Sequence, residues 1–164
     1  MGMGIDHATF RAAMARFPGA VTIITARHGA ERRGITATAV CSVSAEPPSL
    51  LACVNRKTGT CAAIRETGTF NVNLLPDPAS PLAMRFAGAE GVTGEDKFAE
   101  GDWVEDERGL PLLGEALIGF SCNVSEMVEA GSHTVFIGEI IEIRISEGAP
   151  LVYGQSRFHR LEPL

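Results

Sequence analysis

The sequence predicts a mainly β protein, an antiparallel barrel with a few short helices. Two long β runs, residues 116–128 and 134–146, flank residues 129–133 (EAGSH), whose composition favours a hairpin turn. Several shorter strand-like segments precede them. Strictly alternating strand and helix units, which would indicate a doubly wound parallel sheet, are absent, and this combination favours an antiparallel barrel with helical additions.

The first third of the chain contains one predicted helix followed by strands. Asp6 suits a helix N-cap, apolar residues recur at helical spacing up to Phe17, and Pro18-Gly19 ends the helix. The strands predicted here are residues 20–26, 34–44 and 49–54. The third of them is nearly all apolar, as expected for a strand buried on both faces.

The middle of the chain adds two short helices and a long irregular segment. The first helix, residues 60–67, has Gly68 after its C-terminus, and a strand follows at residues 70–75. The second begins with Ser80 as N-cap and Pro81 at its first position, and runs to about Phe86. Residues 88–111 are rich in Gly, Asp and Glu, which predicts a functional lid or an interface loop. Residues 151–153 and 158 finish the chain as strand.

Composition restricts the protein class. The 164 residues, 45% of them hydrophobic, suit one domain, 1–164, and the net charge of −6 argues against binding to nucleic acids or membrane surfaces. The chain has no apolar run of about 18 residues and its N-terminus lacks the pattern of a signal peptide, so we expect a cytoplasmic protein. The four cysteines are widely spaced, which predicts buried thiols and no metal site or disulfide framework.

Residues 34–60 carry the strongest functional signal. In a strand, Thr36 and Thr38 share one face, and so do Ser42 and Ser44 if no bulge intervenes, while the other face is small and apolar. Such a surface leaves room for a flat ring against the backbone. An ordinary solvent-facing strand rich in threonine would show the same pattern.

The turn after the apolar strand favours an anion. Residues 55–60 (NRKTGT) join cations and hydroxyls to the N-terminus of a helix, a combination that suits a phosphate. A solvated basic turn with an N-cap is the alternative. Taken together, a ring surface beside a phosphate site fits flavin mononucleotide (FMN). The chain has no G-x-G-x-x-G or G-x-x-x-x-G-K-[ST] motif, so a nicotinamide cofactor would need a different architecture.

Two further elements are weaker candidates. His133 lies in the predicted hairpin turn, where a histidine is usually just an exposed polar residue. The segment Asp96-Lys97-Phe98 is a candidate ligand edge within an acidic loop. The other histidines show no arrangement typical of a metal site or a catalytic triad.

Five segments follow one another over residues 10–161: FPGAVTIITA, GITATAVCSVSAEPPSLLACVN, TFNVNLL, GSHTVFIGEI and PLVYGQSRFHRL. In this order they resemble the flavin reductase family with the FMN-binding split-barrel fold, which includes the small reductase components of two-component flavin monooxygenases. It implies a homodimer of six-stranded Greek-key split barrels, with flavin near the subunit interface and no metal.

The resemblance also implies site residues. The isoalloxazine edge would lie against Thr36, Ala37, Thr38 and Ala39, and the ribityl phosphate against Ser42, Val43, Ser44, Val54, Asn55, Arg56, Lys57 and Thr58. His133 would lie near the flavin and the nicotinamide, with Phe98, Tyr153, Arg157 and Phe158 completing the pocket. Thr38 and Thr58 stand where serine is frequent and keep the hydroxyl, whereas Ser132 replaces the usual aspartate before the histidine.

The resulting hypothesis is an NAD(P)H:flavin oxidoreductase that transfers a hydride to FMN, or FAD, and supplies reduced flavin to a partner monooxygenase. Two alternatives stay open at this point. One is a reductase that keeps its flavin and passes electrons to ferric iron or a corrin cobalt. The other is a flavin-binding module without turnover. The choice between NADH and NADPH also stays open.

Overall fold

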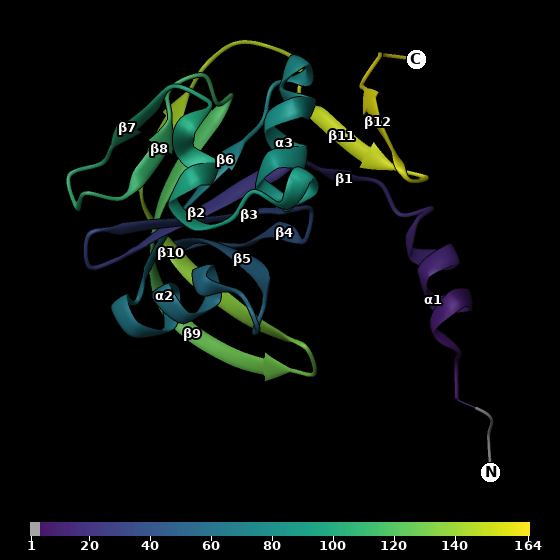
Figure 1. The fold of residues 1–164 in the computed structure, drawn as a ribbon, viewed down its shortest axis with the longest axis horizontal. Helices are drawn as coiled ribbons and strands as arrows, with labels where there is room; N and C mark the ends of the chain where they lie inside the picture. The colour runs from purple at the N-terminus through teal and green to yellow at the C-terminus, as the bar shows by residue number, and fades with distance from the viewer. Residues whose placement is uncertain (1–3) are drawn as a thin grey trace.

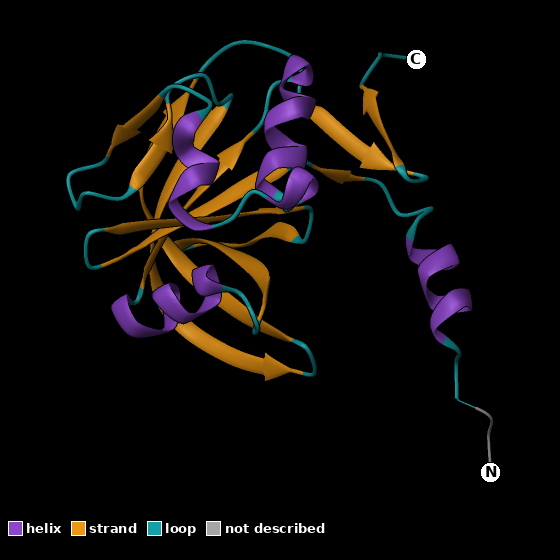
Figure 2. Cartoon of the chain, in the orientation of Figure 1, coloured by secondary structure: helices purple, strands orange, loops and turns teal. Residues whose placement is uncertain are grey.

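A seven-stranded antiparallel sheet forms the body of the protein (Figures 1 and 2). The computed structural model describes residues 4–164. The strand order in the sheet is β3-β2-β6-β9-β10-β5-β4. Its strands are β2 (Thr22–His28), β3 (Glu31–Ala37), β4 (Val40–Ala45), β5 (Pro48–Asn55), β6 (Thr69–Leu74), β9 (Ile118–Ala130) and β10 (His133–Ile145). The predicted fold class, a mainly β antiparallel barrel with a few short helices, is confirmed.

The two edge strands of this sheet, β3 and β4, are consecutive in the chain. Only Thr38 and Ala39 separate them. At these two residues the chain changes its hydrogen-bonded partner strand from β2 to β5, and the Cys53 N–H of β5 donates to the Ala39 carbonyl at 3.0 Å. The prediction of one strand over residues 34–44 is therefore wrong, and the sheet has seven strands instead of six. A register shift between Ser42 and Ser44 also breaks the alternation expected for these two serines.

Two small sheets extend the main one. β1 (Gly19–Ala20), β11 (Leu151–Gly154) and β12 (Arg157–Arg160) form the first, and β7 (Trp103–Glu105) with β8 (Pro111–Leu113) forms the second. The irregular segment 88–111 thus contains β7, the start of β8 and a 3₁₀ helix at Gly94–Ala99. Arg85 fixes this helix by donating to the Lys97 carbonyl at 2.9 Å. The 3₁₀ helix of this segment therefore packs against β3.

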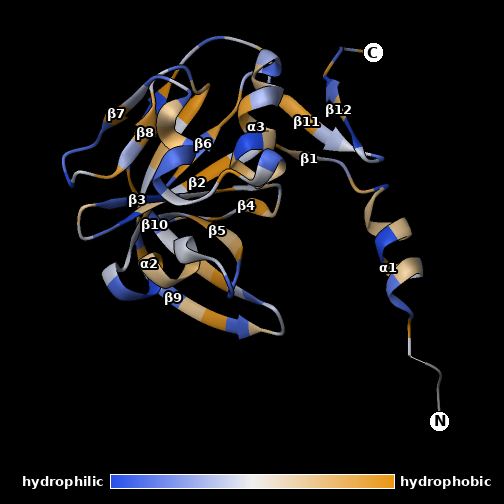
Figure 3. Ribbon diagram, in the orientation of Figure 1, coloured by the Kyte–Doolittle hydropathy of each residue, from blue (hydrophilic) through white to orange (hydrophobic). Residues whose placement is uncertain are grey.

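Two hydrophobic clusters build the core. Phe70, Phe136 and Ile24 belong to the first, which fills the barrel, and α2 (Gly59–Thr67) packs against it. Phe86 and Phe98 belong to the second, which lies between the sheet, α3 (Ser80–Phe86) and the irregular segment. Figure 3 shows hydrophobic residues concentrated in the strands. These clusters fix the positions of β3, α2 and α3, which border the site described below.

Two helix ends follow their predicted chemistry and two do not, because the first helix ends at Met14, before the predicted end at Pro18-Gly19. The Asp6 carboxylate accepts from the Thr9 N–H at 2.9 Å and caps α1 (His7–Met14), and Gly68 ends α2 in the left-handed conformation. Ser80, predicted as an N-cap, is instead the first residue of α3 and makes no capping bond, because a 3₁₀ turn at Asp77–Ala79 leads directly into the helix. Within residues 4–164 none of the helices is long and apolar enough to cross a bilayer.

Helix α1 extends away from the barrel (Figure 1). None of its residues is buried, and Phe10 and Met14 on it are about half exposed. A helix of 8 residues is too short to be stable alone in water. Its apolar side chains therefore form an unpartnered surface of the chain.

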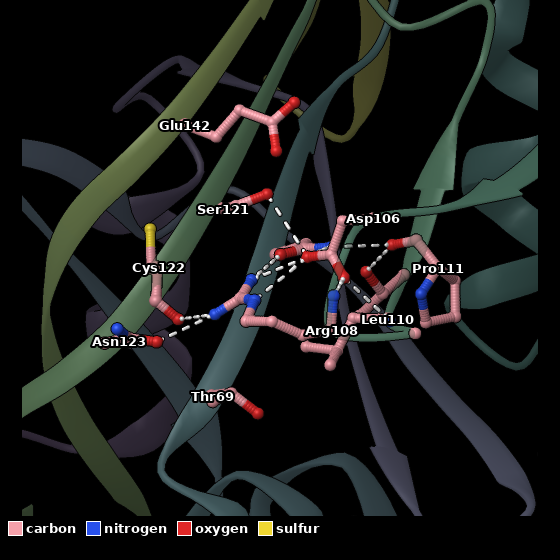
Figure 4. A network of polar contacts seen from close by, with 12 residues as sticks. Thr69, Asp106, Arg108, Leu110, Pro111, Ser121, Cys122, Asn123 and Glu142 are labelled. Carbon is pink, nitrogen blue, oxygen red and sulfur yellow. Dashed lines mark hydrogen bonds and ion pairs between the residues drawn. The ribbon is translucent and has the colours of Figure 1, made fainter.

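A buried ionic network holds the β7–β8 connection on the sheet (Figure 4). The Asp106 side chain is 1% exposed and accepts from the Leu110 N–H at 2.9 Å and from Arg108 at 2.7 Å. Arg108 also donates to the Cys122 carbonyl at 2.8 Å and to the Asn71 side chain at 2.6 Å. Every polar group of the network thus has a partner, as buried charges require.

Candidate functional site

Two adjoining pockets follow strand β3, and we call them together the trough. The hairpin end, about 230 Å³, is lined by Ile35, Thr36, Ala37, Thr38, Ala39, Cys53, Val54, Asn55 and His133. The basic end, about 200 Å³, is lined by Arg33, Gly34, Ile35, Thr58, Gly59, Thr60, Gly94 and Lys97. Ile35 lines both ends, so the two pockets adjoin at this residue of the strand.

The hairpin end offers main-chain donors. Because Thr38 and Ala39 lie between two strands, their N–H groups donate to no backbone carbonyl within residues 4–164. The Thr36 hydroxyl, in contrast, is already engaged, since it donates to the Ala83 carbonyl of α3 at 2.6 Å. The polar edge of a ligand here would therefore be recognised by the backbone at Thr38 and Ala39 rather than by the threonine pair that the alternation suggested.

His133 begins β10 opposite Asn55 of β5, and it is half-buried at the hairpin end. The turn before it is fixed to the β5–α2 turn, because the Arg56 N–H donates to the Ser132 carbonyl at 3.0 Å. The Ser132 Oγ lies 2.8 Å from His133 Nδ1. The position of His133 is therefore fixed both by the main chain of its turn and by the contact of its ring with Ser132.

The basic end combines two cations with a free hydroxyl. Lys97 Nζ donates to the carbonyls of Gly34 at 3.2 Å and Phe86 at 3.0 Å, and its burial lowers the pKa of the amine. Arg33 lies against Gly59, where an added Cβ would come within 3.0 Å of the guanidinium. Thr60 is 3% exposed, yet its hydroxyl bonds to no atom of residues 4–164.

Thr58 plays a local part at this end. Its hydroxyl donates to the Asn55 carbonyl at 2.8 Å and accepts from the Cys61 N–H at 3.2 Å, so it caps α2. The N-terminal residues of α2 therefore line the same pocket as the two cations. Such an arrangement of helix terminus, cations and an unpaired hydroxyl suits a phosphate group.

The trough brings together about half of the residues named from the sequence. These are Thr36, Ala37, Thr38, Ala39, Val54, Asn55, Thr58 and His133. Ser42 and Ser44 line a separate apolar pocket with Val72 and Phe120, on the far side of the break at Thr38–Ala39, and Val43 is exposed.

The other predicted residues also lie outside the lining of the trough. Arg56 is exposed and pairs with Glu129 at 3.4 Å, and its neighbour Lys57 is exposed. Phe98 is buried between Phe86 and Trp103 and acts as core. The last three predicted residues, Tyr153, Arg157 and Phe158, lie in the small sheet of β11 and β12. The rings of Tyr153 and Phe158 pack edge to face.

Two lining residues of the basic end, Thr60 and Lys97, belong to segments that the sequence indicated: residues 55–60 for an anion and residues 96–98 for a ligand edge. Arg33, Gly34 and Cys53 also line the trough and were not predicted. Gly34 and Cys53 stand within the 34–60 block, so the local pattern could have included them, whereas Arg33 meets Lys97 only through the packing of the 94–99 helix on β3, which leaves no local signal. Residues 4–164 contain no cluster of ligating side chains that could hold a metal ion.

Comparison with known proteins decides the family. The model of the flavin reductase like domain matches residues 14–162. The chain belongs to the flavin reductase family. Two curated relatives of this flavin reductase are the 4-hydroxyphenylacetate 3-monooxygenase reductase component of Pseudomonas aeruginosa, 42% identical over 154 residues (93% of this chain, 91% of that protein), and the FMN reductase (NADH) RutF of Pseudomonas syringae pv. syringae, 38% identical over 158 residues (96% and 88%).

Solved structures agree with this assignment. The flavin reductase PheA2 in its native state has a TM-score of 0.87 at 34% identity and covers 97% of this chain and 100% of its own. The NADH:FAD oxidoreductase SgcE6 of Streptomyces globisporus C-1027, solved with NAD and FAD fragments, has a TM-score of 0.89 at 30% identity and covers 99% and 98%. The split-barrel fold class predicted for this flavin reductase is therefore confirmed.

The residues present fit a flavin. The hairpin end has two unpaired main-chain donors for the polar edge of a ring and small side chains beside them. The basic end has two cations and the Thr60 hydroxyl for a phosphate. The two ends meet at Ile35, which suits a ligand whose ring and anion are joined by a short chain.

Proposed function

We propose that this chain, acting as one domain, is an NAD(P)H:flavin oxidoreductase that reduces FMN, or FAD, and supplies the reduced flavin to a partner monooxygenase. The observation that supports it most directly is the trough, in which main-chain donors at Thr38–Ala39 lie in line with the cations Arg33 and Lys97. Both relatives reported above carry names that fit this activity. Free thiols at all four cysteines suit a reducing cytoplasm, where we place the protein.

The hairpin end orients the ring of the flavin. The N–H groups of Thr38 and Ala39 donate to its polar edge, and donors fixed in this way also stabilise negative charge on a reduced ring. The small side chains at Ala37 and Ala39 leave the flat face of the ring accessible to a second planar group. When bound, the flavin supplies the hydride-accepting atom for the chemistry.

The basic end holds the phosphate. Lys97 has one ammonium proton left after its two carbonyl bonds, and the Thr60 hydroxyl and the N-terminus of α2 face the same space. These groups bind charge without taking part in hydride transfer. They are therefore expected to set affinity for the flavin and to leave the chemical step unchanged.

His133 serves the nicotinamide substrate. Its place at the hairpin end would let the imidazole hold the carboxamide of NAD(P)H beside a bound flavin. Hydride transfer needs no strong acid or base, and this agrees with a site built from hydroxyls, main-chain groups and one histidine. We accordingly propose His133 as the catalytic residue.

The test is a measurement of flavin reduction. The purified protein, with added FMN or FAD, should oxidise NADH or NADPH. In stopped-flow absorbance measurements, His133→Ala should slow hydride transfer by about 10- to 100-fold, while its affinity for flavin stays within about threefold of wild type. Thr9→Ala, at the N-terminus of α1, is a matched control and should behave as wild type. No oxidation of either nucleotide with either flavin would refute the proposal. A flavin that stays bound and cannot be exchanged would favour the reductase that passes electrons onward.

We further propose that the protein is a homodimer. Beyond α1, the outer surface of β9 and β10 exposes apolar side chains that a monomer would leave in water, among them Met127, Val128, Ile141, Ile143 and Ile145. A pair of charged substitutions, Ile143→Glu with Ile145→Glu, should convert the dimer to a monomer in light scattering coupled to gel filtration. A wild-type monomer at micromolar concentration would refute this assembly.

A further inference from the structure

The contact between Ser132 and His133 has a chemical consequence for the trough. The Ser132 Oγ lies 2.8 Å from Nδ1 of the adjacent ring, and within residues 4–164 it is the hydrogen-bond partner of that ring. Nε2 has no bond to any of these residues and is the nitrogen left for a ligand. We propose that Ser132 is a positioning residue that keeps a proton on His133 Nε2 whether the ring is neutral or charged. This inference rests on the proposed function, because it assigns Nε2 to the nicotinamide carboxamide.

A serine hydroxyl both donates and accepts hydrogen bonds. In the arrangement proposed here it donates to Nδ1 of the neutral ring, which leaves the ring proton on Nε2. Toward a protonated ring it accepts from the Nδ1–H, and Nε2 again carries a proton. The donor presented to the ligand is therefore the same for the neutral and the protonated ring.

A carboxylate at position 132 would act in the opposite way. An ionised carboxylate can only accept, so it would draw the proton of the neutral ring to Nδ1 and leave Nε2 as an acceptor. The site would then have its Nε2 donor only while the ring is protonated. The identity of residue 132 thus decides whether hydride transfer depends on the protonation state of the ring.

The charged groups near the ring do not change this comparison. They are Arg56 and Lys57 on the β5–α2 turn and Glu129 on β9, and the Cys53 thiol also borders the pocket. Arg56 and Arg65 both pair with Glu129, at 3.4 and 2.8 Å, so that carboxylate is engaged. Because these groups are common to the wild type and to every variant at position 132, differences between them report the side chain at that position.

The first experiment observes the ring in the flavin-free protein. Nitrogen-15 NMR of histidine-labelled protein distinguishes the two neutral tautomers, and His133→Ala identifies the signal among the four histidines. We expect the Nε2–H tautomer in wild type and in Ser132→Thr, and the Nδ1–H tautomer in Ser132→Asp. A wild-type ring with its proton on Nδ1, or the same tautomer in wild type and Ser132→Asp, would overturn the proposal.

The second experiment measures hydride transfer by stopped flow from pH 5.5 to 8.5. The wild-type rate and that of Ser132→Thr should change less than about twofold over this range. Ser132→Asp should become about tenfold slower from the lowest to the highest pH, the equivalent of one lost hydrogen bond. Ser146→Asp adds the same charge at an exposed position of the β10–β11 connection and should follow wild type. A profile for Ser132→Asp that matches wild type overturns the proposal. A wild-type protein without reductase activity refutes the proposed function instead, and the NMR result then decides the role of Ser132 separately.

Discussion

Lys97 gives the most specific test of how the trough holds an anion. Its ammonium group carries three donors, and two of them are used by the main-chain carbonyls of Gly34 and Phe86. The remaining donor faces the basic end, where a charge-assisted hydrogen bond to a phosphate contributes about 1.5–3 kcal/mol. Lys97→Met removes this bond, so FMN should bind roughly 10- to 150-fold more weakly.

Riboflavin provides the internal comparison, because it has the same ring and ribityl chain but no phosphate. Quenching of flavin fluorescence during titration of the flavin-free protein measures both affinities. In Lys97→Met, riboflavin affinity should stay within about threefold of wild type while FMN affinity falls. Lys57→Met, which removes a cation from the exposed turn outside the lining, should change FMN affinity by less than about twofold, about what a solvent-exposed charge contributes.

Two results would show that the reasoning is wrong. Equal losses for FMN and riboflavin would mean that Lys97 supports the fold of the trough and not the phosphate. Unchanged FMN affinity would place the phosphate elsewhere. A thermal melt of Lys97→Met accompanies the titration, because the Gly34 and Phe86 carbonyls lose their donor and the melting temperature should fall by a few degrees.

Further predictions concern the core and the buried network. Asp106→Asn should lower the free energy of unfolding by about 2–4 kcal/mol in urea denaturation, because Arg108 loses a buried ionic partner. Burial raises the pKa of Asp106, but the hydrogen bonds from the Leu110 N–H and from Arg108 outweigh this effect, so the net pKa is lowered. The stabilisation that the ionised carboxylate gives is therefore complete above about pH 4 and is lost as pH falls through the folded-state pKa. At that low pH, wild type and Asp106→Asn should converge in stability. Gly138→Ala should be destabilised by about 1–3 kcal/mol in the same assay, because its Cβ would lie 2.6 Å from the Phe70 ring; equal stability of wild type and this variant would show that the ring can move aside.

Local chemistry made most of the fold predictable. The hairpin between β9 and β10, the cap at Asp6 and the left-handed Gly68 all follow from residues that are neighbours in the chain. The break at Thr38–Ala39 could not be predicted in this way. The sequence continues its β pattern through these residues, and the change of partner strand from β2 to β5 is a property of the closed sheet.

The candidate site divides along the same line. Its parts within residues 34–60 and His133 carry a local signal, and the trough includes most of them. Ser42 and Ser44 were assigned by extending an alternation across the break, which sends them to another pocket. Lys97 lies in a segment that the sequence indicated as a ligand edge, but its place beside Arg33 depends on Arg85, which fixes its helix, and on the Gly34 carbonyl of β3, which accepts from its amine. Such contacts between distant segments leave no trace in a single sequence.

The two-residue passage between β3 and β4 makes ligand recognition tolerant of mutation. The donors at positions 38 and 39 belong to the main chain, so replacing either exposed side chain leaves them in place, and only a proline would delete one. Natural or engineered substitutions at these two positions can therefore change the shape of the pocket while its main-chain hydrogen-bond donors to the ligand stay in place.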